Sequence, residues 1–493
     1  MREKIFSNKI QEMTLPAKVL FIIPGFEDVY GNYKYLYKRG FLNPPMGLCY
    51  LASSLEHAGH EVKIIDGEAQ RLRITDIISM AKEYKPDLFG LTATSIEIGK
   101  IISLASDLKG YFPQTPIVLG GTHINIFENK VLEENPVFDF GCIGDGEDFI
   151  LELIDALEDP QNSQKFYSVK GLIFRKEGKV IQNSYRLMES NLDRYRFPAR
   201  HLLLNNLYAR VVPKKGYVAT ASFMSSRGCP YSCIYCAVKS IHGQNVRLRT
   251  AENVVEELEY IVNKIGIDHI AFNDDCLTLD RERMYKICSG IRKAKLKFTW
   301  EGLSRADLVD KELLIEMKQS GLIRISYGIE SGNLKILKFL RKNETLEQIS
   351  RAFKISQDVG IATRGSVLIG VPYETQETVR DTFNFVQNLQ GLDEVIINIL
   401  QPYPGTQVRE MILRGEGGSR LADGKIGFDG LKRFGSASVF VNDLTPAKLV
   451  SLQNEGFLKF YIRPFNLLRR IYLYGLMTVL KDGFMFLRGL IST

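Results

Sequence analysis

Three cysteines stand close together in the run Arg-Gly-Cys-Pro-Tyr-Ser-Cys-Ile-Tyr-Cys, as Cys229, Cys233 and Cys236. Their spacing is C-x3-C-x2-C, and no fourth cysteine is near in the sequence. Three thiolates can hold three irons of a four-iron, four-sulfur cluster and leave the fourth iron open to bind and reduce a ligand. The pattern therefore predicts an open [4Fe-4S] cluster.

Two other interpretations of these cysteines stay open at this point. Cysteine is often a small buried apolar residue, although a triplet this tight, with glycine before it and proline inside it, is seldom plain core. The serious competitor is zinc, because His242 follows Cys236 by six residues and could complete a Cys3His site. A fully protein-ligated metal, with His242 or Cys276 as the fourth donor, would remove the open position.

Length and composition bound the class of protein. A chain of 493 residues is expected to form two or three domains. Seven cysteines, three of them clustered, indicate a reducing compartment and metal chemistry rather than a disulfide framework. Residues 1–15 lack the apolar core of a signal peptide, and no stretch is apolar enough to span a membrane. The net charge is +7, and the sequence contains no basic run that would indicate nucleic-acid binding. We expect a cytoplasmic protein.

The first part of the chain alternates short apolar strands with amphipathic runs such as 47–58 and 96–109. Strands separated by helices predict a Rossmann-like, doubly wound parallel sheet, with ligands at the carboxyl ends of its strands. Glycine-rich, polar segments follow the strands there, as a binding rim requires. The expected strands are 19–23, 62–65, 88–91, 117–119 and 138–143.

The alternation restarts at Thr220, after a predicted hairpin (167–184, with its turn at Glu177 and Gly178) and a weakly periodic stretch. Six strand–helix repeats, with helical runs such as 251–265 between the strands, predict a partial (β/α)6 barrel with chemistry at the carboxyl ends of its strands. The cysteine loop follows the first of these strands directly. Beyond Gly405 the pattern loosens into a helical C-terminal tail, from about Pro446. The expected barrel strands are 221–225, 269–273, 298–301, 324–327, 366–369 and 395–400.

These patterns predict an α/β protein with five segments. They are an N-terminal extension (1–17), a doubly wound domain with its hairpin (18–189), a linker (190–219), the partial barrel (220–410) and the C-terminal helical region (411–493).

The cysteine loop resembles the signature of the radical S-adenosylmethionine enzymes. The resemblance implies that the open iron chelates the methionine part of S-adenosylmethionine, and that reductive cleavage yields a 5′-deoxyadenosyl radical that removes a substrate hydrogen. The family usually has an aromatic residue before the third cysteine, beside the adenine, and Tyr235 stands there. A surface tyrosine is the plain alternative.

Other runs in the barrel half match the same family, each at the end of an expected strand. By resemblance, Asp274 and Asp275 would bind the ligand's amino group and Arg305 its carboxylate. The plain alternatives are a helix cap and a surface ion pair. Tyr403 could donate a proton or hydrogen atom to a substrate. A tyrosine that only packs against its neighbours is an equally good interpretation. The remaining candidates for S-adenosylmethionine are Glu330, Ser331 and Gly370.

The first domain resembles the cobalamin-binding domains fused to one branch of this family. The likeness is carried by 43–48, 87–91, 120–123 and 144–147. One departure is that the motif Asp-x-His-x-x-Gly, which supplies a lower-axial histidine, is absent; His123 is the nearest candidate, and a polar loop histidine is the plainer interpretation. The implied cobalamin-binding residues are Thr94, Ser95, Gly120, Gly121, Thr122, Gly144, Gly146 and Glu147.

The resemblance implies an oxygen-sensitive methyltransferase that methylates a poorly activated carbon of a small molecule, with the methyl group from cobalamin and electrons from a donor such as flavodoxin or ferredoxin. A radical cyclisation, ring contraction or oxidation without methyl transfer is the alternative of the same chemistry. A non-catalytic metal- or cobalamin-binding regulatory module is the alternative of another class. The apolar, basic tail suggests a lipid or hydrophobic natural product as substrate, or peripheral membrane contact; packing on the barrel is its plain interpretation.

Overall fold

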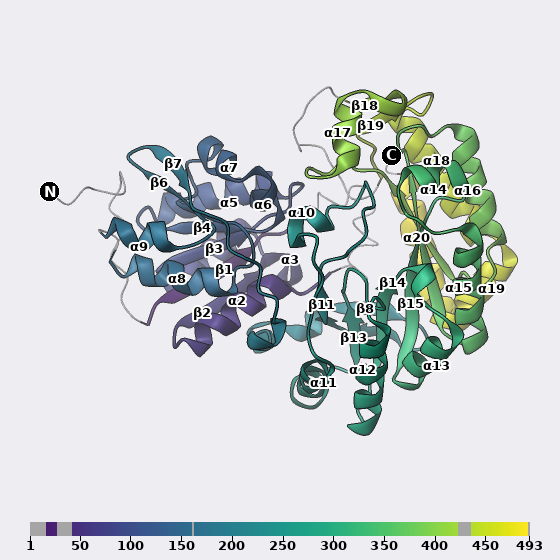
Figure 1. Cartoon of the computed structure of the whole chain (residues 1–493), viewed down its shortest axis with the longest axis horizontal. Coiled ribbons are helices and arrows are strands. Elements are labelled where there is room, and N and C mark those ends of the chain that lie inside the picture. Colours follow the sequence, from purple (N-terminus) through teal and green to yellow (C-terminus); the bar gives the residue numbers. More distant parts are fainter. Residues whose placement is uncertain (1–15, 27–41, 160–161, 423–434, 492–493) are drawn as a thin grey trace. The chain divides into compact units, whose positions relative to one another are not determined.

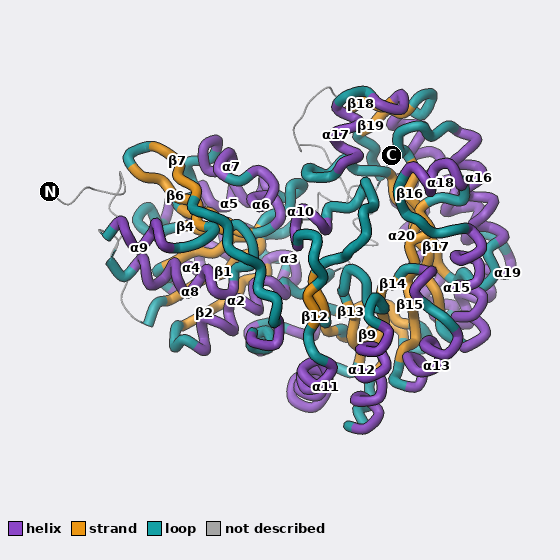
Figure 2. The backbone as a smooth tube through the Cα atoms, in the orientation of Figure 1, coloured by secondary structure: helices purple, strands orange, loops and turns teal. Residues whose placement is uncertain are grey.

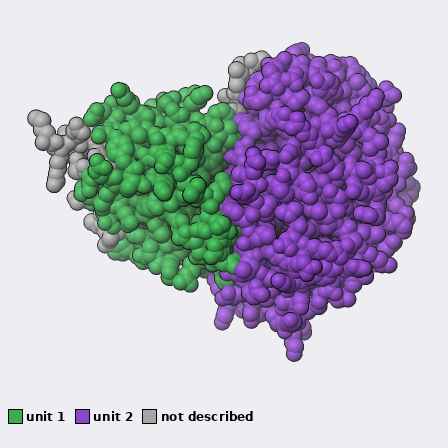
Figure 3. Space-filling model, viewed as in Figure 1, with its two compact units in different colours: residues 1–27, 44–207 green, residues 28–43, 208–493 purple. Residues whose placement is uncertain are grey.

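The computed structural model describes residues 16–26, 42–159, 162–422 and 435–491, so nearly all of the predicted extension 1–17 lies outside it. The described chain divides into two compact units: the first contains 16–26 and 44–207, and the second contains 42–43 and the described residues from Tyr208 onward (Figures 1 and 3). The division falls inside 190–219, the stretch predicted to be a linker. Each unit is described by itself.

The first unit is built on a seven-stranded sheet in the order β2-β1-β3-β4-β5-β6-β7. Strands β1 to β5 pair in parallel, and β6 and β7 form the predicted antiparallel hairpin at one edge. Its strands are β1 (Lys18–Ile23), β2 (Glu61–Asp66), β3 (Leu88–Thr92), β4 (Ile117–Gly120), β5 (Phe140–Cys142), β6 (Leu172–Lys176) and β7 (Lys179–Gln182).

Strand β1 is buried along most of its length because helices cover the parallel part of the sheet (Figure 2). The chain leaves β1 toward β2 on one side and reaches β3 on the other, so the strand order reverses at β1/β3. In open α/β sheets, ligands bind outside the carboxyl ends of the strands at such a point. The helices are α2 (Met46–His57), α3 (Gly67–Gln70), α4 (Ile74–Tyr84), α5 (Ile98–Tyr111), α6 (Thr122–Phe127), α7 (Asn129–Glu134), α8 (Glu147–Leu157) and α9 (Ser163–Ser168).

The second unit contains six parallel strands in the order β10-β13-β14-β15-β16-β17, which is the predicted partial barrel. These strands are β10 (Ala221–Phe223), β13 (His269–Phe272), β14 (Thr299–Ser304), β15 (Leu322–Glu330), β16 (Ala362–Ile369) and β17 (Glu394–Ile399). Short antiparallel pairs are β8 (Ala209–Val212) with β9 (Gly216–Ala219), β11 (Ser226–Arg227) with β12 (Arg247–Leu248), and β18 (Ser419–Leu421) with β19 (Val439–Val441).

Local signals set the helix ends of this unit. Thr345 forms a capping box with Gln348 at the start of α15, which ends before Gly360 in the left-handed conformation. Thr445 caps α18, whose first residue is Pro446. The helices are α10 (Val238–His242), α11 (Ala251–Tyr260), α12 (Arg281–Lys293), α13 (Lys311–Gln319), α14 (Leu334–Phe339), α15 (Leu346–Val359), α16 (Gln376–Asn388), α17 (Gln407–Leu413), α18 (Pro446–Tyr461), α19 (Pro464–Tyr474) and α20 (Leu476–Ile491).

Two elements differ from expectation. The helix expected over 251–265 widens after Tyr260 into a π-helical turn, Ile261–Ile265. Strand β15 continues through Gly328 and ends at Glu330, whereas the sequence suggested that Gly328 to Ser331 follow the strand. The register against β16 shifts between Gly328 and Glu330, and Glu330 has a φ of 61°, a left-handed backbone that a non-glycine residue rarely adopts. Such outliers cluster at functional sites.

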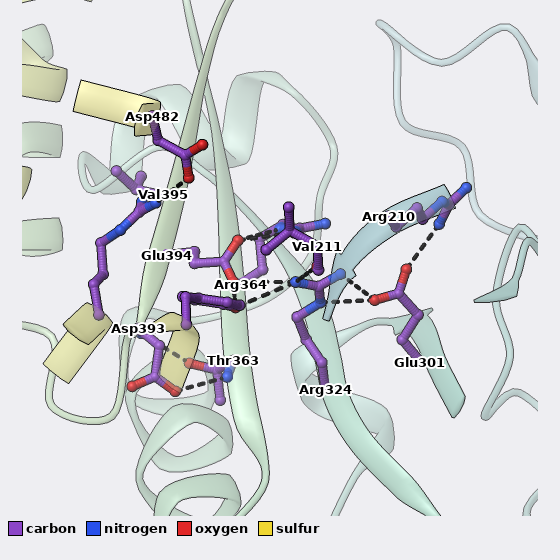
Figure 4. Close-up of polar contacts among 12 residues, drawn as sticks. Arg210, Val211, Glu301, Arg324, Thr363, Arg364, Asp393, Glu394, Val395 and Asp482 are labelled. Atoms are coloured by element: carbon purple, nitrogen blue, oxygen red, sulfur yellow. Dashed lines mark hydrogen bonds and ion pairs between the residues drawn. The ribbon is translucent and has the colours of Figure 1, made fainter. Parts of the chain in front are cut away.

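A buried ionic network lies at the amino ends of the barrel strands (Figure 4). Arg324 of β15 donates to Glu301 of β14 through Nε at 2.7 Å and to Glu394 of β17 at 3.2 Å. Arg210 of β8 donates to the other oxygen of Glu301 at 2.7 Å. Tyr474 of α19 also bonds Glu394, so the C-terminal helices are joined to the barrel at the end away from the cysteine loop.

Candidate active site

The cysteine loop begins just after β10 and β11, at the carboxyl end of the barrel sheet. Cys229, Cys233 and Cys236 are each half-buried, so all three thiols reach the surface of the unit. Two backbone bonds hold the middle of the loop: the N–H of Ile234 donates to Leu340, and the Ile234 carbonyl accepts from Val408. The loop is thereby attached to the segments after β15 and β17.

Two adjacent carboxylates brace the start of this loop. Asp274 is fully buried and accepts bonds from the Ser225 hydroxyl at 2.6 Å and the Ser226 hydroxyl at 2.5 Å. Asp275 accepts from the N–H of Gly228 at 2.9 Å. Gly228 has a φ of 95°, and a Cβ there would lie 2.7 Å from the Asn245 carbonyl, so only glycine fits. In this structure both aspartates position the loop, and the predicted contact with a ligand amine stays a prediction.

Arg305, which follows β14, is buried against the same loop. Its guanidinium makes two bonds of 2.9 Å to Asp307 and lies 3.7 Å from the ring centroid of Tyr231, which stands between the first two cysteines. This stacking over an aromatic face is a favourable cation–π geometry. Arg305 therefore holds Tyr231 in place, and its guanidinium already has a carboxylate partner.

Glu330 and Tyr235 meet at the end of β15. Burial, followed by the negative charge of the nearby Glu330 carboxylate, raises the pKa of Tyr235 well above its ordinary value. On its other side Glu330 lies 3.6 Å from the ammonium of Lys342, which also lies 3.5 Å from Glu344. All three charged groups are buried. Burial disfavours the charged lysine, but the two carboxylates outweigh it and raise the pKa of Lys342.

Replacing Lys342 with methionine is expected to destabilise the barrel by about 1.5–3 kcal/mol, because it removes the cation that Glu330 and Glu344 share and leaves Glu344 with Arg305 at 3.6 Å. Urea unfolding followed by the fluorescence of Trp300 measures this, since that buried residue is the chain's single tryptophan. Lys335→Met, at an exposed position nearby on α14, is the matched control and should leave the midpoint unchanged. Equal midpoints for the two variants would contradict the assignment.

Two further predicted residues take part in packing. Ser331 is fully buried, and its hydroxyl bonds Thr382 of α16 at 3.0 Å and accepts from the N–H of Asn333 at 3.1 Å. Gly370 has a φ of 83°, and a Cβ there would lie 3.1 Å from Leu449 of α18. Both residues therefore contact the helix layer in this structure, and a role for either in holding a ligand stays a prediction.

The turn after β17 lies beside the cysteine loop. Tyr403 is half-buried in this turn, where its carbonyl accepts the Thr406 hydroxyl at 2.6 Å. The carbonyl of Gly405 accepts the Ser240 hydroxyl of α10 at 2.6 Å. Tyr403 is thus on a segment bonded to the helix that follows the third cysteine, and its role toward a substrate stays a prediction.

The donor set fits an iron–sulfur cluster better than a single zinc ion. Across the described ranges, no three His, Cys, Asp or Glu side chains converge as they would around one metal ion. A cluster spreads its thiolates over separate irons, so it does not need that convergence. Burial raises the pKa of Cys236 to about 11, so metal binding there must displace a proton. The arrangement disfavours completion of a zinc site by His242.

The predicted cobalamin residues gather at the carboxyl ends of β3, β4 and β5 in the first unit. Gly144 has a φ of 93° with open space where a Cβ would stand, so a flat molecule can approach its backbone. A Cβ on Gly121 would lie 2.5 Å from Thr92 Oγ1, and one on Gly146 would lie 2.8 Å from Leu51. Those two glycines permit close packing.

Some polar residues of this rim already form hydrogen bonds within the unit. The Thr94 hydroxyl donates to Glu97 at 2.7 Å. Glu147 is buried in the first turn of α8, whereas Gly120 and Thr122 stay half-exposed. The half-exposed backbone and hydroxyls of β3–β5 fit a large polar cofactor, and the role of each residue in binding it stays a prediction.

His123 is a buried side chain at the start of α6, where the sequence suggested a polar loop histidine. Its Nδ1 lies 3.0 Å from the Ser95 hydroxyl, and its ring packs on Phe127 with centroids 4.7 Å apart. Burial lowers the pKa of His123 from 6.5 to about 4. The neutral ring therefore holds Ser95 and the loops after β3 and β4 in place. His123 is part of the core of the first unit.

The His123 shift predicts acid sensitivity. The unfolded chain binds a proton at this ring below about pH 6.5 and the folded unit only near pH 4, so stability is complete above pH 6.5 and declines as the pH falls toward 4. We expect a decline of about 1–3 kcal/mol from this residue. Denaturation measured by circular dichroism at pH 7.5 and pH 4.5 should show a smaller pH effect in His123→Gln than in the unmodified chain; identical declines would refute it.

Sequence reasoning missed Tyr231, Lys342 and Glu344. Tyr231 stands inside the cysteine motif, so the motif itself could have suggested it. Lys342 and Glu344 follow a short helix, in a segment where Arg341 and Asn343 have positive φ angles. No sequence pattern separates these two charges from ordinary surface residues, because their burial depends on the loops packed around them.

Two family models match this chain. Residues 223–386 match the radical SAM superfamily, and residues 34–154 match the B12-binding domain. The first match spans β10 to α16 and includes the cysteine loop. The second includes the carboxyl-end rim of the first unit.

Individual proteins resemble three quarters or more of the chain. An uncharacterized methyltransferase of Pyrococcus horikoshii is 30% identical over 459 residues, which cover 92% of this chain and 95% of the relative. The anaerobic magnesium-protoporphyrin IX monomethyl ester cyclase of Rubrivivax gelatinosus is 28% identical over 379 residues, or 75% of this chain and 66% of the cyclase. The structure of the methyltransferase TsrM from Kitasatospora setae, with cobalamin and a [4Fe-4S] cluster bound, has a TM-score of 0.69 at 18% identity and covers 92% and 90% of the two chains. This likeness confirms the predicted fold class.

Proposed function

Because this chain belongs to the radical SAM superfamily, in the branch that also carries a B12-binding domain, we propose that it methylates a poorly activated carbon of a small molecule. The observation that supports this proposal most strongly is the presence of two features in one chain. One is a loop with three cysteines at the carboxyl end of a partial barrel, and the other is a doubly wound unit with glycines along its binding edge. The match to the methyltransferase of P. horikoshii, which covers 95% of that protein, supports the proposal.

The matches confirm the predicted family, its enzymatic nature and its three cofactors: the iron–sulfur cluster, S-adenosylmethionine and cobalamin. Cys229, Cys233 and Cys236 would hold the cluster, which supplies an open iron and a low-potential electron when present. The rim of β3–β5 would hold cobalamin, which supplies a transferable methyl group. Because the His123 ring is hydrogen-bonded to Ser95, we expect cobalamin to be bound without this histidine as a ligand.

The chain's own residues position these reactants. Asp275 and Asp274 hold the start of the cysteine loop, and Arg305 holds Tyr231 within it. Tyr235 and Glu330 interact electrostatically at the edge of the loop, where we propose that they contact the adenine and ribose of S-adenosylmethionine. Tyr403, on the turn bonded to α10, is the candidate proton or hydrogen donor to the substrate.

A small molecule is the substrate class. The related cyclase is named for a porphyrin ester, which supports a large apolar substrate for this chain as well. An external one-electron donor such as flavodoxin or ferredoxin would complete the reaction. The likeness to the cyclase also supports the second candidate function, a radical cyclisation or oxidation without methyl transfer.

The test is anaerobic incubation of the reconstituted protein with a reductant, a source-cell extract and S-adenosylmethionine labelled at its methyl group. Methyl transfer predicts bound corrinoid, 5′-deoxyadenosine, and a product that gains one labelled methyl group. A product that loses hydrogens and gains no label would support the cyclase alternative. A protein that produces no 5′-deoxyadenosine under these conditions would be a binding module, and the proposal would fail.

A further inference from the structure

The last two helices expose a concentration of large apolar side chains. Among the described residues, 21 large hydrophobic side chains are exposed, and nine of them lie between Ile462 and Phe484. Scattered apolar residues on a surface are ordinary, but a concentrated group marks an interaction site. The nine are Ile462, Phe465, Leu467, Leu468, Tyr472, Leu476, Met477, Leu480 and Phe484.

The spacing of six of these residues places three of them on one face of each helix. Phe465, Leu468 and Tyr472 of α19 follow one another by three and four positions. Met477, Leu480 and Phe484 of α20 repeat the same spacing. Residues at i, i+3 and i+7 share a helical face. Each helix therefore carries an outward apolar stripe, here called the α19 stripe and the α20 stripe.

The opposite face of α19 is firmly packed on the barrel. Leu473 and Tyr474 are buried, and the Leu473 carbonyl accepts the N–H of Lys214 from the β8–β9 turn at 2.6 Å. Arg469 makes a 2.6 Å ion pair with the buried Asp393 at the start of β17. Arg470 pairs with Asp482, which joins α19 to α20 at 3.3 Å (Figure 4). The stripes are therefore the outer surface of a docked helical pair, with their inner faces already used.

The charge around the stripes is positive. Residues 463–491 contain five arginines and lysines and the single acid Asp482; two of the arginines are already paired, Arg469 with Asp393 and Arg470 with Asp482. Lys481 is exposed immediately after Leu480 of the α20 stripe. The ammonium of Lys214 lies 5.0 Å from the ring centroid of Tyr472 of the α19 stripe. Apolar stripes bordered by lysines suit a surface that is apolar inside and anionic outside.

A bilayer surface suits this combination better than a protein partner. Protein interfaces are depleted in lysine relative to other surfaces. Interfacial helices, in contrast, combine a large apolar face with lysines and arginines, which bind anionic headgroups. No described helix is long and apolar enough to cross a membrane, so a surface orientation is the mode that the described helices allow.

We propose that the α19 and α20 stripes form a docking surface for an anionic lipid bilayer, on which these helices lie in the plane of the headgroups. The residues that insert are the exposed aromatic and aliphatic side chains of the two stripes, and Lys214 and Lys481 contact the headgroups. This surface stands apart from the cysteine loop, so the proposal goes beyond the proposed reaction and does not depend on it.

Flotation of the reconstituted full-length protein with extruded vesicles tests this. With vesicles of phosphatidylcholine and phosphatidylglycerol at a ratio of about 7:3, we expect the protein to float, and to float less with phosphatidylcholine alone or at high salt. The triple variant Phe465→Ser, Leu480→Ser, Phe484→Ser should lose at least about tenfold in partitioning, because each exposed apolar side chain that is removed would otherwise be buried in the bilayer. Lys481→Glu should weaken binding to the anionic vesicles only.

The matched control is Leu187→Ser with Leu334→Ser, which removes two exposed leucines outside the stripes. It should bind vesicles as the unmodified protein does, and all variants should retain their iron content and unfolding midpoint. If the unmodified protein does not float, or if the control loses binding equally, the proposal fails. If light scattering shows a dimer that the triple variant converts to a monomer, without flotation of either, a second copy of this chain covers the stripes and the lipid proposal is overturned.

Discussion

Alanine at Cys233 is expected to reduce the iron and sulfide content of the reconstituted protein to background and to abolish 5′-deoxyadenosine formation. Alanine at Cys276 is expected to leave both intact. The two thiols make a matched pair, because Cys276 is the nearest alternative donor: burial, and then the adjacent Cys229, raise the pKa of Cys276 to about 12. Removing one of three thiolates leaves too few donors to hold the cluster and keep one iron open.

The burial of the four thiols is the reason for this contrast. Cys229, Cys233 and Cys236 are half-buried in one loop, whereas Cys276 lies beneath the surface after β13 with 4% of its area exposed. Iron and sulfide analysis together with electron paramagnetic resonance of the reduced protein measures the outcome. If Cys276→Ala lost the cluster, the fourth iron would be protein-ligated, and both the radical chemistry and the methyl transfer would have to be abandoned.

Methionine at Arg324 is expected to destabilise the barrel by about 3–5 kcal/mol, because removing one partner of a buried ion pair leaves the others uncompensated. Burial alone would raise the pKa of Glu301, but Arg324 and Arg210 outweigh it and hold that pKa well below its ordinary value. Without Arg324, Glu301 keeps one cation and Glu394 keeps Arg364 at 2.8 Å (Figure 4). The loss therefore reflects both a missing cation and unfilled hydrogen bonds.

Trp300 reports this loss directly, since it precedes Glu301 in β14 and is fully buried. Its fluorescence in a urea titration should shift to a lower midpoint in Arg324→Met. Lys354→Met removes an exposed i,i+4 pair with Asp358, 3.1 Å apart, and should change stability by less than about 0.5 kcal/mol. A change in Arg324→Met no larger than in this control would mean that the network contributes nothing to the fold.

The same network explains why the tail is part of the barrel unit. Tyr474 bonds Glu394 at the start of β17, and Arg469 pairs with the neighbouring Asp393. Packing on the barrel, the plain interpretation of the tail, therefore describes the inner face of α19. The apolar residues that do not pack on the barrel form the two exposed stripes.

The elements themselves were predictable because their signals are local. An apolar run such as Val19–Ile22 is buried between helix layers, and a threonine followed by a helical pattern, as at Thr345, begins a helix. The six expected barrel strands form in chain order, and the hairpin turns at Glu177 and Gly178 as expected. Where the prediction differed, at the end of β15, the cause is the register shift beside Glu330, which depends on the neighbouring strand.

The candidate site was only partly predictable. Cys229, Cys233 and Cys236 lie within eight residues, so one loop carries them and the sequence alone determined their association, the family and its cofactors. The partners of that loop come from segments far apart in the chain: Asp274 bonds Ser225 and Ser226, and Lys342 lies between Glu330 and Glu344. A charged side chain has the same local pattern whether it is solvated or buried, and only the packing of the loops on one another decides which it becomes. The tertiary structure therefore decided that Ser331 bonds α16, that His123 is an anchor in the core, and that Arg324 joins three strands, because burial is a property of the assembled unit and not of any one segment.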